Sequence, residues 1–429
     1  MTETAPTSLT ELSARETAAR VNDSSLTAQT VCAAFADRIA AAEPQVQAFA
    51  YFDRERALAE AFAAPAGPLA GVTFGVKDII DTADMPTSYG SEVYEGYQPA
   101  WDAPAVALAR RLGGVVMGKT VTVEFALKSP GKTRNPHNTA HTPGGSSSGS
   151  CAAVAAGMVQ VAFGTQTAGS ILRPSSYCGV VGYKPSFGTL NRTGVKPLSD
   201  SLDHVGLVTR DVRDAAFAVA ALAEKPALAQ GTAGPALRVG LFRTSRWAQA
   251  EPATRAALAR ATAAIQAAGG TVRELDVPES FEGYYALFDA VMGWETPRTL
   301  DYERYQLGER LSPITLDFIE TLARATREDY DAALAVLKHR EALVEELLDG
   351  CDVLITPAAP GEAPAGLGAT GDPVFNKVWT LLHVPALAVP AGLGPQGLPV
   401  GVQVIGRIGT DAETLAAAAF IEDALKAMS

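Results

Sequence analysis

Short apolar runs alternate with stretches of helical periodicity along most of this 429-residue chain. The runs VVMGKT (115–120) and VQVAFGTQT (159–167) are typical of strands that are buried on both faces. Between strand-like runs lie segments such as DAPAVALARRLGG (102–114), which is typical of a helix that ends at a glycine. Alternation of this kind predicts one large α/β domain with a mostly buried central sheet.

The chain divides most naturally near residue 65. Residues 1–65 have helical periodicity and are predicted to form a helical N-terminal extension, and residues 66–429 are predicted to form the α/β domain. The segments that carry candidate chemistry fall within a catalytic core at 68–210.

Composition and charge exclude several classes of protein. Hydrophobic residues make up 47% of the chain and charged residues 19%, which suits a large folded core and not a disordered chain. The net charge is −12 and there is no basic stripe, so no nucleic-acid partner is expected. No apolar run is long enough to cross a membrane, and the polar N-terminus lacks the apolar core of a signal peptide. We therefore expect a cytoplasmic protein with no membrane partner.

The four cysteines are scattered, and none belongs to a CxxC motif or lies near a histidine pair. This spacing predicts neither a zinc site nor a disulfide framework, and we expect each cysteine to be a small buried apolar residue. No other cluster of metal-ligand type lies near the serine-rich segment, so the sequence predicts no metal and no organic cofactor. The cysteines are Cys32, Cys151, Cys178 and Cys351.

The segment TPGGSSSGSCAAVAAG (142–157) joins a glycine-serine stretch to a run of small apolar residues. Its first half is typical of a flexible linker and its second half of a tightly packed helix. The segment GSSSG (145–149) also matches the G-x-S-x-G elbow of α/β-hydrolases, with Ser147 as the nucleophile. That elbow requires a buried strand directly before it, whereas residues 131–143 are polar and interrupted by prolines. An α/β-hydrolase esterase remains an alternative, with histidine candidates at His204, His339 and His383.

A second motif match is GGVVMGKT (113–120), which satisfies the phosphate-loop pattern G-x-x-x-x-G-K-[ST]. The phosphate loop needs a strand, then a loop of free N–H groups, then a helix. Here strand-like residues occupy the loop positions and a helix precedes them. We interpret Lys119 and Thr120 as the end of a buried strand.

Three segments together resemble the amidase signature family. PLAGVTFGVKDIIDTADMPTSYGS (68–91) is similar to the lysine segment of the family, and NPHNTAHTPGGSSSGSCAAVAAG (135–157) to its glycine-serine segment. GTQTAGSILRPSSYCGVVGYKPSFG (164–188) is similar to its nucleophile segment. The resemblance extends to HVPALAVPAG (383–392) and so spans almost the whole chain. It implies the fold of the family, a single large domain with a central mixed β-sheet covered by helices on both faces.

The resemblance also implies a serine hydrolase of amide-type bonds that uses no histidine. Carried over to this chain, Ser170 is the nucleophile, Ser146 is the bridging serine beside a cis peptide bond, and Lys77 is the base. Backbone N–H groups of the turn before the nucleophile form the oxyanion hole. In this chain that turn is Thr167, Ala168 and Gly169, followed by Ser170 itself.

Elementary chemistry supports the same residues. Lysine acts as a base only when it is neutral, and burial lowers the pKa of a lysine by about 3–5 units. Lys77 lies in the apolar run GVTFGVKDII (71–80), where a lysine is rarely found without a function. We expect Ser147 to support the relay by hydrogen bonding, and Ser148 and Ser150 to cap the helix that follows.

The nucleophile segment departs from the pattern G-T-D-x-G-G-S-I-R that is common in the family. Gln166 replaces the aspartate, Ala168 a glycine and Leu172 the arginine, while an arginine follows as Arg173. Arg173 is expected either to be satisfied by backbone carbonyls or to hold a substrate carboxylate. Gln166, Arg173, Asn376 and Trp379 are candidate substrate-binding residues, together with Tyr94, Trp101 and Phe375.

The substrate class stays open at this level, because the family acts on aliphatic and aryl amides, dipeptide amides, carbamates and ureas. We expect a small-molecule amide or carbamate substrate, some ester activity, and a monomer or homodimer. The family also includes the glutaminase component of the tRNA-dependent amidotransferase, its A-type subunit, which hydrolyses glutamine and passes ammonia to a partner. That component is the second alternative.

Overall fold

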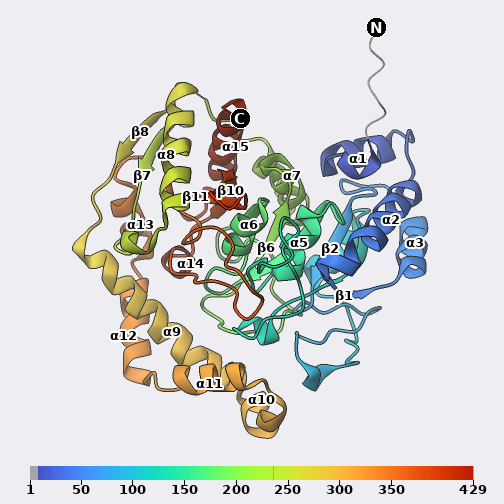
Figure 1. The fold of residues 1–429 in the computed structure, drawn as a ribbon, viewed down its shortest axis with the longest axis horizontal. Helices are drawn as coiled ribbons and strands as arrows, with labels where there is room; N and C mark the ends of the chain where they lie inside the picture. Colours follow the sequence, from blue (N-terminus) through green and yellow to red (C-terminus); the bar gives the residue numbers. More distant parts are fainter. Residues whose placement is uncertain (1–7, 235, 429) are drawn as a thin grey trace.

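An eleven-stranded mixed β-sheet crosses the whole molecule in the computed structural model, which describes residues 8–234 and 236–428. The strands are ordered β1-β3-β2-β4-β6-β5-β10-β11-β9-β7-β8 (Figure 1). The strands span β1 (Phe49–Phe52), β2 (Thr73–Lys77), β3 (Val115–Thr120), β4 (Val161–Gln166), β5 (Val181–Lys184), β6 (His204–Thr209), β7 (Arg238–Leu241), β8 (Thr271–Glu274), β9 (Val353–Pro357), β10 (Ala386–Leu393) and β11 (Pro399–Ile405). One large α/β domain with a mixed sheet is confirmed.

Helices surround this sheet, and several of them form an arm along one edge of the molecule. The N-terminal helices lie beside β1 and β2, and α9 to α12 follow the opposite lower edge (Figure 1). The α-helices are α1 (Ala14–Asn22), α2 (Ala28–Val46), α3 (Arg54–Ala63), α4 (Pro104–Arg111), α5 (Ser148–Ala155), α6 (Leu172–Cys178), α7 (Val212–Leu222), α8 (Pro252–Ala267), α9 (Gly283–Thr299), α10 (Asp301–Gln306), α11 (Pro313–Leu322), α12 (Arg327–Leu337), α13 (Arg340–Leu348), α14 (Lys377–Leu381) and α15 (Asp411–Ala427).

Side chains of β3 and β4, which lie toward the β1 end of the sheet, alternate between two cores. Val116 and Phe163 pack with α4 and α7 in one core, whereas Met117 and Ala162 pack with α2 and α5 in the other. All four residues are fully buried, as expected for strands covered on both faces. The predicted cover of helices on both faces is therefore present at this part of the sheet.

The N-terminal segment contains an element that the sequence did not predict. Phe49–Phe52 form the short edge strand β1, which pairs antiparallel with β3. Helical periodicity on either side concealed this strand, because four residues are too few to establish a period of two. The described part of residues 1–65 is therefore not wholly helical, and it contributes an edge to the main sheet; residues 1–7 lie outside the described ranges.

Parallel pairing of β2 with β4 determines where the chemistry gathers. Phe74 pairs with Val161 and Val76 with Phe163, so the carboxyl ends of the two strands meet at the same edge of the sheet. Ligands of α/β sheets bind outside the carboxyl ends of parallel strands. Lys77 ends β2 there, and the chain turns into the segment 167–170 directly after β4.

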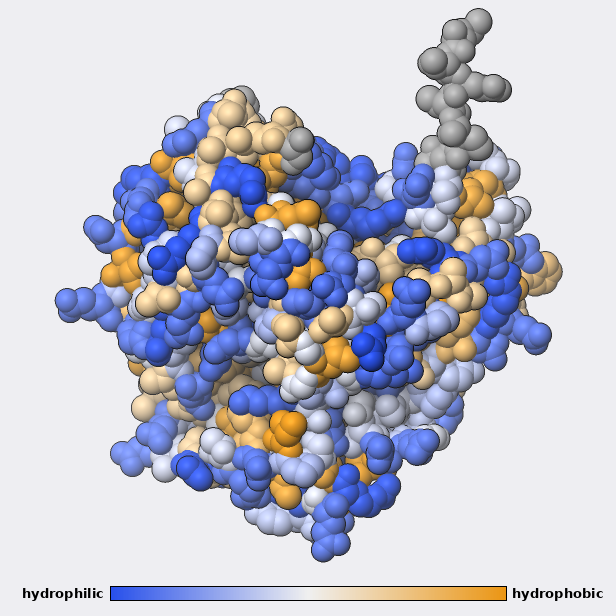
Figure 2. Space-filling model, in the orientation of Figure 1, coloured by the Kyte–Doolittle hydropathy of each residue, from blue (hydrophilic) through white to orange (hydrophobic). Residues whose placement is uncertain are grey.

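The surface carries its apolar groups in small patches. On the face shown in Figure 2, these patches are separated by hydrophilic side chains. Within residues 8–234 and 236–428, none of the helices combines the length and the apolar character that crossing a bilayer requires.

Candidate active site

Lys77 is fully buried at the end of β2 and makes three hydrogen bonds. Its Nζ donates to Ser146 Oγ at 2.7 Å, to Thr165 Oγ1 at 2.7 Å and to the Thr165 carbonyl at 3.4 Å. Burial lowers the pKa of Lys77 to about 7, although nearby Cys151 and Asp203 act in the opposite direction. A substantial fraction of this amine is therefore neutral near pH 7 and able to accept a proton.

The glycine-serine loop brings Ser146 to this lysine. Gly144 has a φ of +80°, a conformation that side chains disfavour, and the Gly145–Ser146 peptide bond is cis, as the family resemblance implies. Ser147 Oγ donates to the Thr165 carbonyl at 3.3 Å. Ser147 thus holds the end of β4, whose Thr165 also contacts Lys77.

The expected capping role of Ser148 and Ser150 is wrong. Helix α5 begins at Ser148 with Ser147 as its N-cap residue, and no side chain caps it. Ser148 Oγ donates to the Val121 carbonyl, and Ser150 Oγ donates to the Phe163 carbonyl at 2.9 Å. These hydroxyls bind the neighbouring strands because α5 begins directly against the edge of the sheet.

Ser170 lies in the turn after β4 and is 8% exposed. Its carbonyl accepts a hydrogen bond from the Ser147 N–H at 3.1 Å, which fixes the nucleophile segment against the glycine-serine loop. Within the described ranges, no side-chain hydrogen bond joins Ser170 Oγ to Ser146 Oγ, and the N–H groups of Ala168, Gly169 and Ser170 have no acceptor. The N–H of Thr167, which was also predicted to serve in the oxyanion hole, likewise has no acceptor among the described residues. Successive free donors beside a serine hydroxyl are the groups that an oxyanion hole uses.

Gln166, a candidate for substrate binding, supports the nucleophile segment and does not line the cavity at Ser170. Its Oε1 accepts from the N–H groups of Ile171 and Leu172 at 2.9 and 3.0 Å, and its Nε2 donates to Thr380 Oγ1. The side chain is completely buried. All of its hydrogen-bonding capacity on the oxygen is therefore engaged in shaping the nucleophile segment.

Asn376 and Trp379, two further candidates for substrate binding, are buried and do not line the cavity at Ser170. Asn376 donates through Nδ2 to the Ala358 carbonyl and to Gln403 Oε1, each at 3.0 Å. Trp379 packs edge-on against Phe242 in the core. The other candidates, Tyr94, Trp101 and Phe375, are not among the residues that line the cavity at Ser170.

A cavity of about 500 Å³ opens over Ser170. It is lined by Thr167, Ala168 and Arg173, by mostly apolar residues of α9 and α11 that form one wall, and by the loop 368–373. Ser170 and Arg173 are thus in the same chamber, and of the candidate substrate-binding residues only Arg173 lines it among the described residues.

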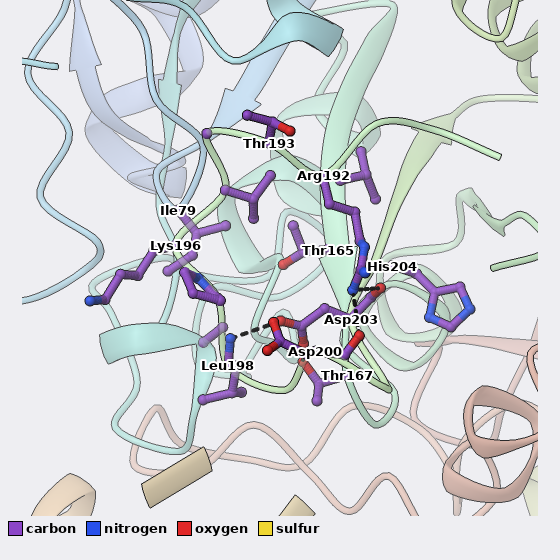
Figure 3. A pocket seen from close by; sticks show the side chains of 15 residues that line it. Ile79, Thr165, Thr167, Arg192, Thr193, Lys196, Leu198, Asp200, Asp203 and His204 are labelled. Atoms are coloured by element: carbon purple, nitrogen blue, oxygen red, sulfur yellow. Dashed lines mark hydrogen bonds between the residues drawn. The ribbon is translucent and has the colours of Figure 1, made fainter. Parts of the chain in front are cut away.

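A second cavity of about 300 Å³ adjoins the first across Ala126, Thr167 and Leu198 (Figure 3). Thr165 lines this second cavity, but Ser170 does not. In Figure 3 the Leu198 N–H points at the carboxylate of Asp203, which it reaches at 2.7 Å. Ser170 therefore lines the larger cavity and not the smaller one.

Thr165 and Asp203 belong to the site, although sequence reasoning did not select either of them. Thr165 receives a hydrogen bond from Lys77, and Asp203 Oδ1 accepts one from Thr167 Oγ1 at 2.6 Å. Burial raises the pKa of Asp203, and its hydrogen bond from Thr167 opposes that rise. Their nearest sequence signal is position: Thr165 precedes the nucleophile turn, and Asp203 directly precedes β6.

The two other motif matches have structural explanations. Lys119 Nζ contacts Asp78 at 3.3 Å and donates to the Ile80 carbonyl at 2.7 Å, so this lysine ends a buried strand, as predicted, and is not free to bind phosphate. All five histidines lie in the described ranges, and none of them hydrogen-bonds Ser146, Ser147 or Ser170. The ring nitrogens of the buried histidines hydrogen-bond to backbone carbonyls, as in His204 with Leu202 and His383 with Ser201.

Adding a methyl group at Gly169 should impair catalysis more than folding. A Cβ at this position would lie 2.4 Å from Asn376 Oδ1, so the turn that carries the free N–H groups must shift. Loss of one oxyanion donor lowers turnover by about 10²–10³-fold, so we expect Gly169→Ala to lower kcat by roughly 10²-fold with a smaller change in KM. Gly283→Ala is the matched control, because nothing lies within 4 Å of a Cβ there. Equal kcat values for the two variants would contradict this role of the turn.

Comparisons with known proteins point to one family. The amidase family model matches residues 30–415. A glutamyl-tRNA(Gln) amidotransferase component of the A type, from Lachnospira eligens, is 31% identical and aligns over 93% of this chain and 95% of its own. The crystal structure of an amidase has a TM-score of 0.85 at 31% identity, covering 96% of this chain and 99% of that one. The peptide amidase of Stenotrophomonas maltophilia has a TM-score of 0.81 at 26% identity, covering 97% of each chain. Because the family match spans most of the chain and includes all three motif segments, the chain belongs to the amidase signature family of hydrolases.

Proposed function

We propose that this hydrolase cleaves carbon–nitrogen bonds of amide type through an acyl-enzyme on Ser170, with Ser146 relaying a proton to Lys77. One observation carries the proposal: the buried Lys77 Nζ lies 2.7 Å from Ser146 Oγ, and the next residue, Ser147, donates its N–H to the Ser170 carbonyl at 3.1 Å. A neutral buried lysine and a relay hydroxyl supply the base that a serine nucleophile requires.

In this mechanism Ser170 Oγ attacks the carbonyl carbon, and its proton passes to Ser146 Oγ as the proton of Ser146 passes to Lys77 Nζ. The negative charge that develops on the carbonyl oxygen is stabilised by the N–H groups of Ala168, Gly169 and Ser170. The proton then returns along the same path to the leaving nitrogen as the carbon–nitrogen bond breaks. Water attacks the acyl-enzyme with the same base and restores Ser170. The hydrogen bond from Ser170 Oγ to Ser146 Oγ forms when substrate is present, since catalytic hydrogen bonds tighten in the complex.

The chemistry uses side chains and backbone donors, and we propose no metal or organic cofactor. A stand-alone enzyme of small-molecule amides or carbamates, monomeric or homodimeric, is the main proposal. Its four cysteines are free and buried, which suits the reducing conditions of the cytoplasm, where we propose that it acts.

The glutaminase component of an amidotransferase is a second candidate. It is favoured by the 31% identity to the amidotransferase component of Lachnospira eligens over nearly the whole of both chains. In that case the chain would hydrolyse glutamine and deliver ammonia to a partner protein.

A hydrolysis screen tests the proposal and separates the two candidates. The purified chain should release amine or ammonia from at least one class of amide, ester, carbamate or urea without glutamine and without a second protein, and a chelator should leave the rate unchanged. Ser170→Ala is the control for each substrate. Activity restricted to glutamine, or present only with a co-purified partner, would favour the amidotransferase component. Full activity in Ser170→Ala would refute the mechanism.

A further inference from the structure

Arg173 is a buried arginine without a carboxylate partner. It is the second residue of α6, three positions after Ser170, and only 4% of the residue is exposed. No acidic side chain within the described ranges comes within 4 Å of its guanidinium. A buried charge that lacks an opposite charge is unfavourable unless hydrogen bonds or a ligand compensate for it.

Its three nitrogen atoms are used unequally. Nε donates to the Thr370 carbonyl at 2.9 Å, and Nη2 donates to the Gly145 carbonyl at 2.6 Å and to Thr370 Oγ1 at 3.3 Å. Nη1 is shielded from solvent and has no acceptor among the described residues. Two of the nitrogens therefore hold the loops around the site, and the third has two unused N–H donors.

The position of the unbonded nitrogen distinguishes Arg173 from other arginines in the described ranges. Arg56, Arg110, Arg246 and Arg340 also have a buried nitrogen without a hydrogen-bond partner, but in each case it is the inner Nε, which in Arg110 still lies 3.4 Å from Glu60. In Arg56, Arg110 and Arg246 the outer nitrogens bind carboxylates. At Arg173 a terminal nitrogen, the part of the guanidinium that reaches farthest, is the unsatisfied one.

Arg173 lines the same cavity of about 500 Å³ as Ser170. The other charged residues of this cavity are Lys128, Asp289, Asp372 and Lys377. Lys377 already pairs with Asp289 at 3.3 Å, and Lys128 is exposed and lies over an aromatic ring of the wall. Asp372 is exposed and farther than 4 Å from Arg173, although its charge acts to raise the pKa of that arginine. The cavity lining thus contains three cations and two carboxylates, which gives it an excess of positive charge. Of the three cations, Arg173 is the buried one.

We propose that Nη1 of Arg173 binds a carboxylate carried by the substrate itself, so that the preferred substrates are amides with an anionic group a few bonds from the scissile carbonyl. This inference rests on the proposed function, because it assigns the substrate class of the same site. The carboxylate accepts a hydrogen bond from an N–H of Nη1 and supplies the missing counter-charge. The contact also orients the scissile carbonyl with respect to Ser170.

Matched substrates test this assignment. Monoamides of short dicarboxylic acids of increasing length are compared with straight-chain alkyl amides of the same length, and N-acyl amino acids test a carboxylate on the amine side. We expect the wild-type kcat/KM to favour one carboxylate series by roughly 10–100-fold, which is the range for a charge-assisted hydrogen bond. Arg173→Gln should reduce this ratio to near 1, and Arg173→Lys should give an intermediate ratio. Arg173 also binds the Gly145 carbonyl, so we expect its variants to hydrolyse every substrate more slowly. For this reason the measurement that tests the inference is the ratio of kcat/KM between the carboxylate and the neutral series.

Binding supplies a second measurement that needs no turnover and no altered arginine. In calorimetry, short dicarboxylates should bind the wild-type chain. In the inactive Ser170→Ala variant, amides that carry a carboxylate should bind at least 10-fold more tightly than neutral amides of the same length. A wild-type enzyme that hydrolyses neutral amides equally well overturns the inference and leaves the proposed function intact. Loss of the preference in Lys128→Gln, with the preference retained in Arg173→Gln, overturns it as well. Tight dicarboxylate binding without any amide hydrolysis supports the anion site and contradicts the proposed function.

Discussion

Replacing Ser170 with alanine should lower turnover by about 10⁴–10⁶-fold, with little change in stability. Loss of a catalytic serine has an effect of this size because the nucleophile and its base act as a unit. A serine-directed fluorophosphonate should label the wild-type chain at Ser170 alone, and peptide mass spectrometry identifies the site. Ser170 is the serine that combines a place in the cavity with adjacent free N–H donors.

Ser147 supplies the matched control for this experiment. It is completely buried, and its Oγ donates to the Thr165 carbonyl, so Ser147→Ala should lower activity only modestly. Ser146→Ala should fall between wild type and Ser170→Ala, because it removes the relay but retains the nucleophile and the free donors. Labelling at Ser147 in place of Ser170 would revive the α/β-hydrolase mechanism.

Replacing Lys77 with alanine or methionine should lower turnover by about 10³-fold or more, because the relay then has no base. Lys77→Arg should be almost as damaging, since arginine does not deprotonate in this pH range. In the wild type, burial lowers the pKa of Lys77 to about 7. The value of kcat/KM should therefore rise through pH 7 as the amine loses its proton, and reach a plateau above about pH 8.

Measurements of stability show whether a Lys77 variant loses activity because the base is missing or because the chain is unfolded. The pKa of Lys77 is lower in the folded chain than in the unfolded chain, so between about pH 7 and pH 10 the unfolded state binds more protons. Stability consequently rises with pH across that window, because folding then releases the proton that the lysine carries in the unfolded chain. Lys77→Met removes the cost of burying this charge, so its melting temperature should exceed that of wild type most clearly below pH 7.

Lys184 is the matched control for a buried lysine away from the site. It is fully buried, burial lowers its pKa to about 7, and its Nζ donates to the Val384 carbonyl. Lys184→Met should affect stability in the same direction and leave the midpoint of the pH–rate profile unchanged. Alanine variants of His204 and His383 should likewise retain that midpoint. An inactive histidine variant beside an active Lys77→Ala would refute the lysine assignment.

Local sequence determined which segments form strands and helices and which residue types carry the chemistry. The apolar runs at 115–120 and 159–167 contain β3 and β4 because a buried strand needs apolar residues on both faces. Lys77 stood out for the converse reason, as a charge inside an apolar run. The four residues of β1 escaped detection because they are too few to show a strand period.

Tertiary structure alone decided which distant segments meet at Ser170. Asn376 and Trp379 lie close to the site in space, but the fold buries both beneath it, and a sequence pattern does not distinguish a wall residue from a supporting one. Asp203 reaches Thr167 because β6 pairs with β4, and Arg173 meets the Thr370 carbonyl across 197 positions of sequence. Periodicity reports only whether a residue is buried. The partners of a buried polar group depend on strand order and loop path, so the unpaired Nη1 of Arg173 became visible only in three dimensions.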